Sequence, residues 1–311
     1  MSASATGFDT PITTGDDGSL TGPFRAPVQM LADQEYGGHA SVHDDAEAAK
    51  LGLAGAPIEG PTHFSQFDPL AVARWGPSWF ESGCISSHFL NMVVEGEEVQ
   101  AALDPNGDSS ATIRAVKPDG TPVLTGTASV GRATTTELDV RRERGTGDPG
   151  ELHIVDQLEI GMTSDPVGVS MDLDTANGAL YPFSLAQKLD AITEASSWYR
   201  PAGDSPWGGA IVPTEMVSVL AHRSGGRFPV RGPAVGLFID LEVRYVEGPV
   251  RVGRAYEVRH EIVGIGQGRS VESYWTESTL TDADAGTHVA TVLLHQGVFK
   301  ASYAGHPDSD G

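Results

Sequence analysis

Stretches in which apolar and polar residues alternate recur along the chain and fall into two groups, one in each half. Alternation with a period of two is typical of strands that bury one face. A Gly/Pro turn precedes a helix that should start near Pro61, because a missing N–H is harmless in a first helical turn. Pro69 should then end or kink that helix. The predicted strands are residues 86–94, 99–103, 110–116 and 123–130 in the first half, and 236–246, 255–263, 270–280 and 287–299 in the second.

Local landmarks recur in the same order in both halves, which indicates an internal duplication. Each half contains a Gly-rich turn before its helix, then a glycine before a strand, then a hairpin turn between two strands. The spacing grows in small steps, as loop insertions would produce. The matched positions are Ile58 with Ile211, Gly96 with Gly253, and Gly120 with Gly286.

The segment between the two copies is polar and charged. Residues 133–150 contain almost no large apolar side chains, which predicts a linker. We therefore expect an N-terminal domain at residues 20–132 and a C-terminal domain at residues 151–303. Each domain should be an α+β unit, an antiparallel sheet wrapped around one central helix, and the two can pair their sheet edges.

Charge and cysteine content narrow the range of partners and compartments. The 311 residues include 42 acidic and 20 basic ones, a net charge of -22, so the average surface field repels phosphate backbones and anionic lipid. We expect no nucleic-acid partner. The single cysteine, Cys84, excludes an internal disulfide and favours the cytoplasm. No export signal and no apolar stretch of membrane-spanning length occurs, so we expect no membrane partner.

The segment between residues 38 and 60 resembles the catalytic segment of the MaoC-like hydratases and dehydratases, a branch of the hot-dog fold. In that family the segment reads Asp-x-Asn-Pro-x-His, then x-Asp, an Ala-rich helix, Gly-Phe and an Ile-x-His-Gly helix start. The resemblance extends over almost the whole chain and implies a tandem, or double, hot-dog fold. The matching text here is Gly38-His39-Ala40-Ser41-Val42-His43, then Asp44-Asp45, an Ala-rich stretch, Gly52-Leu53 and Ile58-Glu59-Gly60.

The resemblance implies roles for several residues. His43 falls on the family's catalytic histidine, and Asp45 on the acidic residue two positions further on. Gly60 falls on the glycine whose N–H polarises the substrate carbonyl. His39 and Tyr199 are further candidates for substrate binding. Depending on the gap chosen in the alignment, Ser196, Trp198 or Tyr199 stands near the histidine position of the second repeat.

The match departs from the family in several respects, and its helix start is one residue shorter than that of the family. Gly38 occupies the position of the catalytic aspartate, and Ala40 occupies that of the asparagine. The histidine also lies in the N-terminal half, whereas double hot-dog hydratases usually carry the catalytic pair in the C-terminal half.

Reversible hydration of an enoyl thioester needs a base for water, an acid for the α carbon and a donor for the enolate oxygen. His43 can supply the first or the second, since the pKa of an unperturbed histidine is about 6.5. Gly60 can supply the third through its N–H and the helix dipole. The usual carboxylate partner is missing, and Asp44, Asp45 or Glu59 can replace it geometrically.

Structural roles compete with these catalytic ones. His43 can be the remnant of an ancestral site, Asp45 can cap the helix that follows it, and His63 can be a packed residue. His39 and His43 have a spacing suited to a metal on a helix, but the neighbouring glycines oppose a helix there, so we expect no metal. No nucleotide or flavin motif is found, and we expect no cofactor.

These features predict a lyase of the enoyl-thioester hydratase or β-hydroxyacyl dehydratase type with an altered catalytic pair, acting on a small molecule such as an acyl-CoA. Several alternatives stay open. One is a hot-dog enzyme that isomerises, cyclises or eliminates a non-thioester carbonyl compound. Others are a thioesterase using Glu59 or Asp68, and a non-catalytic module that binds a hydrophobic ligand. Pairing of two such chains into a homodimer also stays open.

Overall fold

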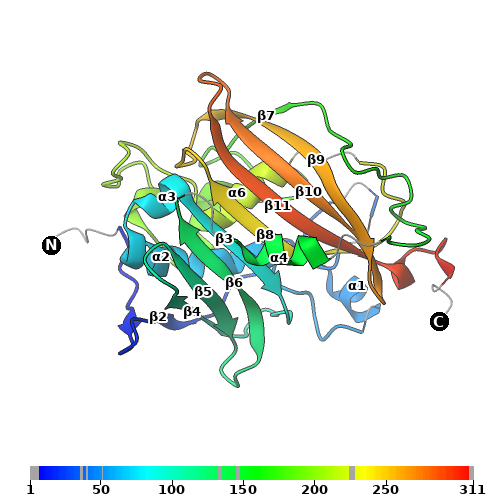
Figure 1. The fold of residues 1–311 in the computed structure, drawn as a ribbon, viewed down its shortest axis with the longest axis horizontal. Helices are drawn as coiled ribbons and strands as arrows, with labels where there is room; N and C mark the ends of the chain where they lie inside the picture. The colour runs from blue at the N-terminus through cyan, green and yellow to red at the C-terminus, as the bar shows by residue number, and fades with distance from the viewer. Residues whose placement is uncertain are drawn as a thin grey trace.

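The predicted strands form one antiparallel sheet in the computed structural model, which describes residues 7–35, 38–39, 41–50, 52–131, 135–144, 148–223 and 228–307 (Figure 1). Within these residues, eleven strands pair in the order β1-β2-β4-β5-β6-β3-β8-β11-β10-β9-β7. Their bounds are β1 Thr13–Thr14, β2 Leu20–Arg25, β3 Gly83–Phe89, β4 Val99–Pro105, β5 Ser110–Val116, β6 Pro122–Val130, β7 Val167–Ser170, β8 Gly236–Tyr245, β9 Ala255–Gln267, β10 Val271–Asp282 and β11 His288–Phe299.

Short helices cover both faces of this sheet. In Figure 1, α6 lies behind the sheet and α4 lies in front of it. The helix α6 contacts β8, β10 and β11 and also packs against η1, so the central helical segments of the two halves touch each other. The helices are α1 Asp45–Lys50, η1 Gly60–Gln66, α2 Asp68–Trp75, α3 Ser78–Ser82, α4 Glu137–Arg144, α5 Leu185–Ala191, η2 Ser197–Tyr199, α6 Thr214–His222 and η3 Lys300–Ser302.

The two halves have the same topology and meet at their edges. Counted outward from the junction, β3, β6, β5 and β4 in the first half correspond to β8, β11, β10 and β9 in the second. The junction is the antiparallel pair β3–β8, in which Ser86 lies opposite Glu242. Pairing the two edges satisfies backbone groups that each half alone would expose. The prediction of an α+β tandem hot-dog fold is confirmed, and the predicted domain boundaries remain a prediction.

The duplicated glycines behave alike, and one matched pair needs a correction. Gly120 and Gly286 both adopt positive φ angles, 85° and 68°, in their hairpin turns. The turn before the helix is shifted by one residue, however. Ile58 N–H donates to the Val93 carbonyl at 2.7 Å, and in the second half it is Val212 that donates to the Val250 carbonyl, at 2.9 Å. Ile58 therefore corresponds to Val212 rather than to Ile211.

The central helical segment of the first half begins at Gly60, next to the predicted Pro61, and is interrupted before Pro69 as that proline requires. The tighter helix η1 ends at Gln66, and α2 begins at Asp68 with Pro69 in its first turn. The largest apolar cluster includes residues of both halves, among them Phe64, Leu241 and Leu294.

Two segments differ from the sequence-based prediction. The strand predicted at 86–94 is β3, which ends at Phe89, because the chain must turn so that Val93 can bond to Ile58. The predicted linker 133–150 contains the helix α4, whose side chain Leu138 is fully buried against Trp275 and Leu293. The boundary at residues 132–133 lies outside the described residues. None of the described helices is long and apolar enough to cross a bilayer.

Candidate active site

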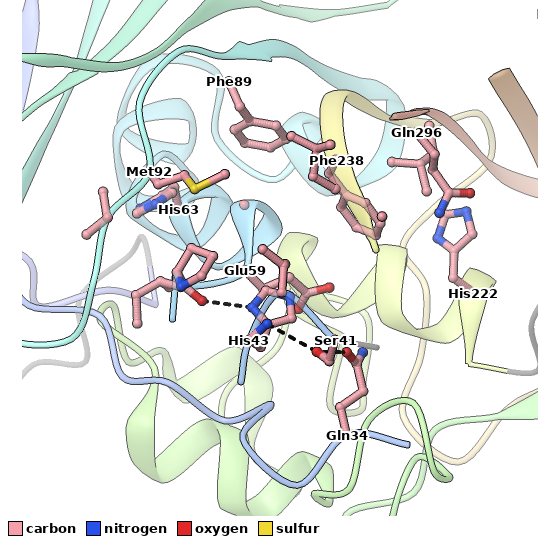
Figure 2. Close-up of a pocket in the computed structure, with 18 of the residues that line it drawn as sticks. Gln34, Ser41, His43, Glu59, His63, Phe89, Met92, His222, Phe238 and Gln296 are labelled. Atoms are coloured by element: carbon pink, nitrogen blue, oxygen red, sulfur yellow. Dashed lines mark hydrogen bonds between the residues drawn. The ribbon is translucent and has the colours of Figure 1, made fainter. Parts of the chain in front are cut away.

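A cavity of about 260 Å³ opens between the two halves, beside the turn that leads into η1. Figure 2 shows His43 and Glu59 near its centre, His63 and Met92 toward one side, and His222 and Gln296 toward the other. Most of its wall is apolar, and polar side chains are set among the apolar ones, as in many small-molecule sites. Apolar lining residues include Ile58, Phe89, Leu90, Met92, Val93, Leu180, Leu237, Phe238 and Leu294.

His43 is held in one orientation at the cavity wall. Its Nδ1 lies 2.8 Å from the carbonyl oxygen of Pro57, and its backbone N–H donates to Ser41 Oγ at 3.1 Å (Figure 2). A carbonyl oxygen only accepts hydrogen bonds, so Nδ1 carries the proton and Nε2 keeps its lone pair. Burial lowers the pKa of His43 below its ordinary value, although the bond to Pro57 opposes this. The imidazole is therefore a neutral base at neutral pH.

Glu59, the residue before the helix, is a buried carboxyl group that lines the same cavity. Burial raises its pKa to about 7, while Lys188 and a hydrogen bond from Tyr181 lower it and Glu215 raises it further. A carboxyl group with a pKa near the ambient pH can give up or take a proton during a reaction. The cavity thus combines a neutral imidazole with a carboxyl group whose pKa is raised to about 7.

Gly60 lines the cavity at the first position of η1. The N–H groups in the first turn of a helix have no partner inside the helix, and the helix dipole favours negative charge there. A Cβ atom at this position would lie 2.6 Å from the ring of Phe89. The close approach of that ring explains why a glycine stands here. The role of its N–H as a donor to a carbonyl oxygen stays a prediction.

The other acidic candidates of the first half have structural roles. Asp45 accepts a hydrogen bond from the Ala56 N–H at 2.9 Å and so orders the turn before the helix. Asp44 accepts from the N–H groups of Ala46 and Glu47, both at 2.9 Å, and caps α1. Neither carboxylate belongs to the cavity lining. Of the three acidic replacements considered from the sequence, Glu59 is the one that lines the same cavity as His43.

Three further sequence positions lie away from the cavity or outside the described residues. The His39 ring lies against Gly232, where a Cβ atom would meet it at 2.4 Å, and His39 is not part of the lining. Gly38, at the position of the missing aspartate, has a φ angle of 89°, a conformation that disfavours side chains with a Cβ. Ala40 is outside the described residues.

Tyr199 also lies away from the cavity. It belongs to the part of the second half that corresponds to the cavity region of the first half. Its hydroxyl donates to Asp68 at 2.8 Å, and Asp68 also accepts bonds from the indole of Trp79 at 2.8 Å and the hydroxyl of Thr214 at 2.5 Å. Because Val212 corresponds to Ile58, Thr214 corresponds to Gly60, and the Thr214 N–H donates to Asp68 at 3.3 Å. In the second half, the N–H equivalent to that of Gly60 is thus occupied by a carboxyl group.

Two histidines that sequence reasoning gave no catalytic role, His63 and His222, also line the cavity. Burial, and then the charge of Lys188, lowers the pKa of His63 to about 4, so this side chain is neutral. Burial lowers the pKa of His222 to about 3, and its ring nitrogens contact the Ser218 carbonyl at 2.9 Å and Ser278 Oγ at 3.4 Å. His222 therefore forms part of the wall. His222 is the last residue of α6 in the second half, and nothing in the sequence indicates that it lines a cavity with residues of the first half.

Comparison with known structures supports the fold. The chain is similar to a protein described as a candidate MaoC-domain dehydratase from Chloroflexus aurantiacus J-10-fl, with 14% identity, a TM-score of 0.57 and coverage of 94% of this chain and 95% of that one. It is also similar to a conserved hypothetical protein from Mycobacterium tuberculosis with a double hot-dog fold, with 10% identity, a TM-score of 0.56 and coverage of 93% and 96%. No protein-family model matches the chain, and no curated protein matches it in sequence. At these identities the likeness establishes a double hot-dog fold.

Proposed function

We propose that this protein is a lyase of the hydratase or dehydratase type that acts on an enoyl or β-hydroxyacyl thioester or a related carbonyl compound. The observation that carries the proposal is the meeting of His43, Glu59 and Gly60 in one largely apolar cavity. These residues supply a base, an acid and a hydrogen-bond donor, the three groups that hydration next to a carbonyl requires.

In the hydration direction, each residue has one task. The Nε2 atom of His43 accepts a proton from water as the water oxygen bonds to the β carbon. The Gly60 N–H donates to the carbonyl oxygen, on which negative charge develops. Glu59 then delivers its proton to the α carbon, and the enzyme is reset when the proton on His43 returns to Glu59. Dehydration follows the same steps in reverse.

The orientation of the histidine supports these assignments. The Pro57 carbonyl holds the proton on Nδ1 and so leaves Nε2 as the basic atom. Glu59 takes the place of the aspartate that the family carries at the position of Gly38. The altered catalytic pair is therefore proposed to be His43 and Glu59. It replaces the pair of His43 and Asp45 that the sequence predicted.

The test is the change in ultraviolet absorbance as the conjugated double bond of crotonyl-CoA is lost. We expect His43→Ala and Glu59→Gln each to lower the rate by about 100-fold or more, the size of a general acid–base contribution. Asp45→Asn is the matched control: it removes an acidic residue outside the cavity, and we expect its rate per folded molecule to stay within about twofold of the unchanged protein. Equal rates for the unchanged protein and His43→Ala would contradict the proposal.

A second candidate function is the same type of reaction on a different substrate, an uncharged carbonyl compound that is not a coenzyme A ester. The titratable side chains of the lining are histidines, tyrosines and Glu59, and burial favours the neutral forms of His43, His63, His222 and Glu59. Such a cavity suits a neutral ligand, and the net charge of -22 repels the phosphates of coenzyme A. Turnover of crotonyl-N-acetylcysteamine in preference to crotonyl-CoA would favour this candidate.

The thioesterase alternative is now limited to Glu59. Both oxygens of Asp68 accept hydrogen bonds in the interior, and Asp68 is not part of the cavity lining. Release of free thiol from an acyl-CoA would identify that activity. A cytoplasmic location and a homodimer of two chains remain proposals, the first because the single cysteine is a free and buried one.

A further inference from the structure

An ion pair lies buried beside the cavity. Lys188 Nζ is 2.8 Å from Glu215 Oε2, and their side chains are 5% and 2% exposed. Burying two charges is unfavourable unless their surroundings compensate, so such a pair is weak evidence for a role in stability alone. Both residues come from the second half, Lys188 from α5 and Glu215 from the first turn of α6.

The pair adjoins the turn that carries Glu59. Lys188, Thr62 and Glu59 line one small void, and Glu59 lines the main cavity as well. Lys188 Nζ lies 3.4 Å from Thr62 Oγ1, and the Thr62 N–H donates to the Glu59 carbonyl at 3.1 Å. The ammonium group therefore contacts the same helical turn that presents the Glu59 carboxyl group.

Local structure fixes the position of the ammonium group. Ser184 and Gln187 form a reciprocal capping box at the start of α5, which orients the turn that carries Lys188. The ring of Phe183 lies 6.0 Å from Nζ and limits its movement on another side. The Lys188 side chain is therefore held in place and does not extend into solvent as a surface lysine does.

We propose that Lys188 and Glu215 are positioning residues that set the proton occupancy of Glu59. The inference rests on the proposed function, in which Glu59 is the acid. Lys188 favours the ionised form of Glu59, and Glu215 opposes it. The other titratable groups around Glu59 are Tyr181, which donates a hydrogen bond to it, and the neutral His43 and His63.

The two members of the pair should therefore act in opposite directions. Lys188→Met removes the cation and leaves Glu215 near Glu59, so the pKa of Glu59 should rise. Glu215→Gln leaves the cation without its partner, so the pKa of Glu59 should fall. A purely structural ion pair would give two variants that lose stability and activity in the same way.

The experiment compares the pH dependence of kcat/KM for crotonyl-CoA hydration in the unchanged protein, Lys188→Met and Glu215→Gln. Activity that needs protonated Glu59 declines as the pH rises through its pKa, and this decline should move to higher pH in Lys188→Met and to lower pH in Glu215→Gln, each by about one pH unit. Lys188→Arg keeps the charge and should restore the original profile. Displacement of both profiles in one direction, or of neither, would overturn the inference.

A readout independent of turnover is the infrared band of the protonated carboxyl group, followed against pH and assigned by its loss in Glu59→Gln. Its midpoint should shift in the same opposite directions. Opposite shifts in a protein that hydrates no thioester would uphold the inference about Glu59 and contradict the proposed function. If the single variants do not fold, Lys188→Met combined with Glu215→Met replaces the pair by apolar groups. Its band should then titrate close to that of the unchanged protein, and a shift as large as that expected for a single variant would overturn the inference.

Discussion

Gly60 is the position where a single added methyl group tests the geometry of the cavity. A Cβ atom there would lie 2.6 to 2.9 Å from three atoms of the Phe89 ring, so the ring must move. Phe89 lines the cavity, and displacement of a wall residue would misplace the substrate that we propose binds there. We expect Gly60→Ala to lower kcat/KM on the order of 10- to 100-fold.

The matched control is Gly55→Ala, because a Cβ atom at Gly55 would meet its nearest neighbour at an ordinary 3.5 Å. The measurement is the steady-state hydration rate together with the melting temperature of each variant. An unchanged kcat/KM in Gly60→Ala would show that the first turn of η1 does not contact the substrate.

At the scale of single residues, sequence singled out His43 and Gly60 as candidates because both fall on a known pattern of residue types, and both line the cavity. It offered Asp44, Asp45 and Glu59 as equal replacements for the missing carboxylate. Their difference is burial, which depends on how the turn packs against the second half. Tyr199 could not be placed, because its alignment depended on a gap, and its partner Asp68 lies in the other half.

Among the elements, α4 has the most informative contacts. It lies across the junction strands β3 and β8 on the face opposite α6, and the Leu138 N–H donates to Ser86 Oγ at 3.1 Å. Beside it, the buried carboxylate of Asp240 accepts bonds from His88 at 2.7 Å and His295 at 2.6 Å, with Arg141 of α4 at 3.6 Å. This cluster joins β3, β8, β11 and α4.

Asp240→Asn should destabilise the protein by about 3 kcal/mol, because it removes the charge that holds this cluster together. Burial raises the pKa of Asp240, but the bonds from His295 and His88 outweigh burial and hold it below its ordinary value of 3.8. A lowered pKa means that the carboxylate stabilises the fold above about pH 4 and that this contribution is lost as the pH falls further.

Urea unfolding of the unchanged protein and of Asp240→Asn, at pH 7 and at pH 3, measures the difference in their free energies of unfolding. We expect a large gap in unfolding free energy at pH 7 that narrows at pH 3. Arg144→Ala, at an exposed position of the same helix, serves as the control. A difference in unfolding free energy of equal size at both pH values would exclude the charge of Asp240 as the cause of the destabilisation.

Alternation of burial made the strands predictable. In β9 every second residue from Tyr256 to Ile262 is buried, and the sequence pattern shows this directly. The helix α4 was missed because it buries a single apolar side chain, Leu138, in a polar segment. A helix that packs through one leucine and through salt bridges leaves no periodic signal.

The whole molecule is a duplicated unit whose two copies have diverged at equivalent places. In the first half, the turn before the helix faces an open cavity lined by His43, Glu59 and Gly60. In the second half, Asp68 and Tyr199 fill the equivalent position, and Thr214 takes the place of Gly60. Sequence revealed the duplication but not this asymmetry, because the residues that close the second position come from both halves.

The central claim is that chemistry takes place in the open cavity of the first half. The most direct measurement is the hydration rate of one enoyl thioester by His43→Ala and Tyr199→Phe, side by side with the unchanged protein. We expect His43→Ala to lose activity by about 100-fold or more. Tyr199→Phe should keep full activity and lose about 1 kcal/mol of stability, since Asp68 loses one hydrogen bond. Full activity in His43→Ala with loss of activity in folded Tyr199→Phe would place the reaction in the second half and contradict the account.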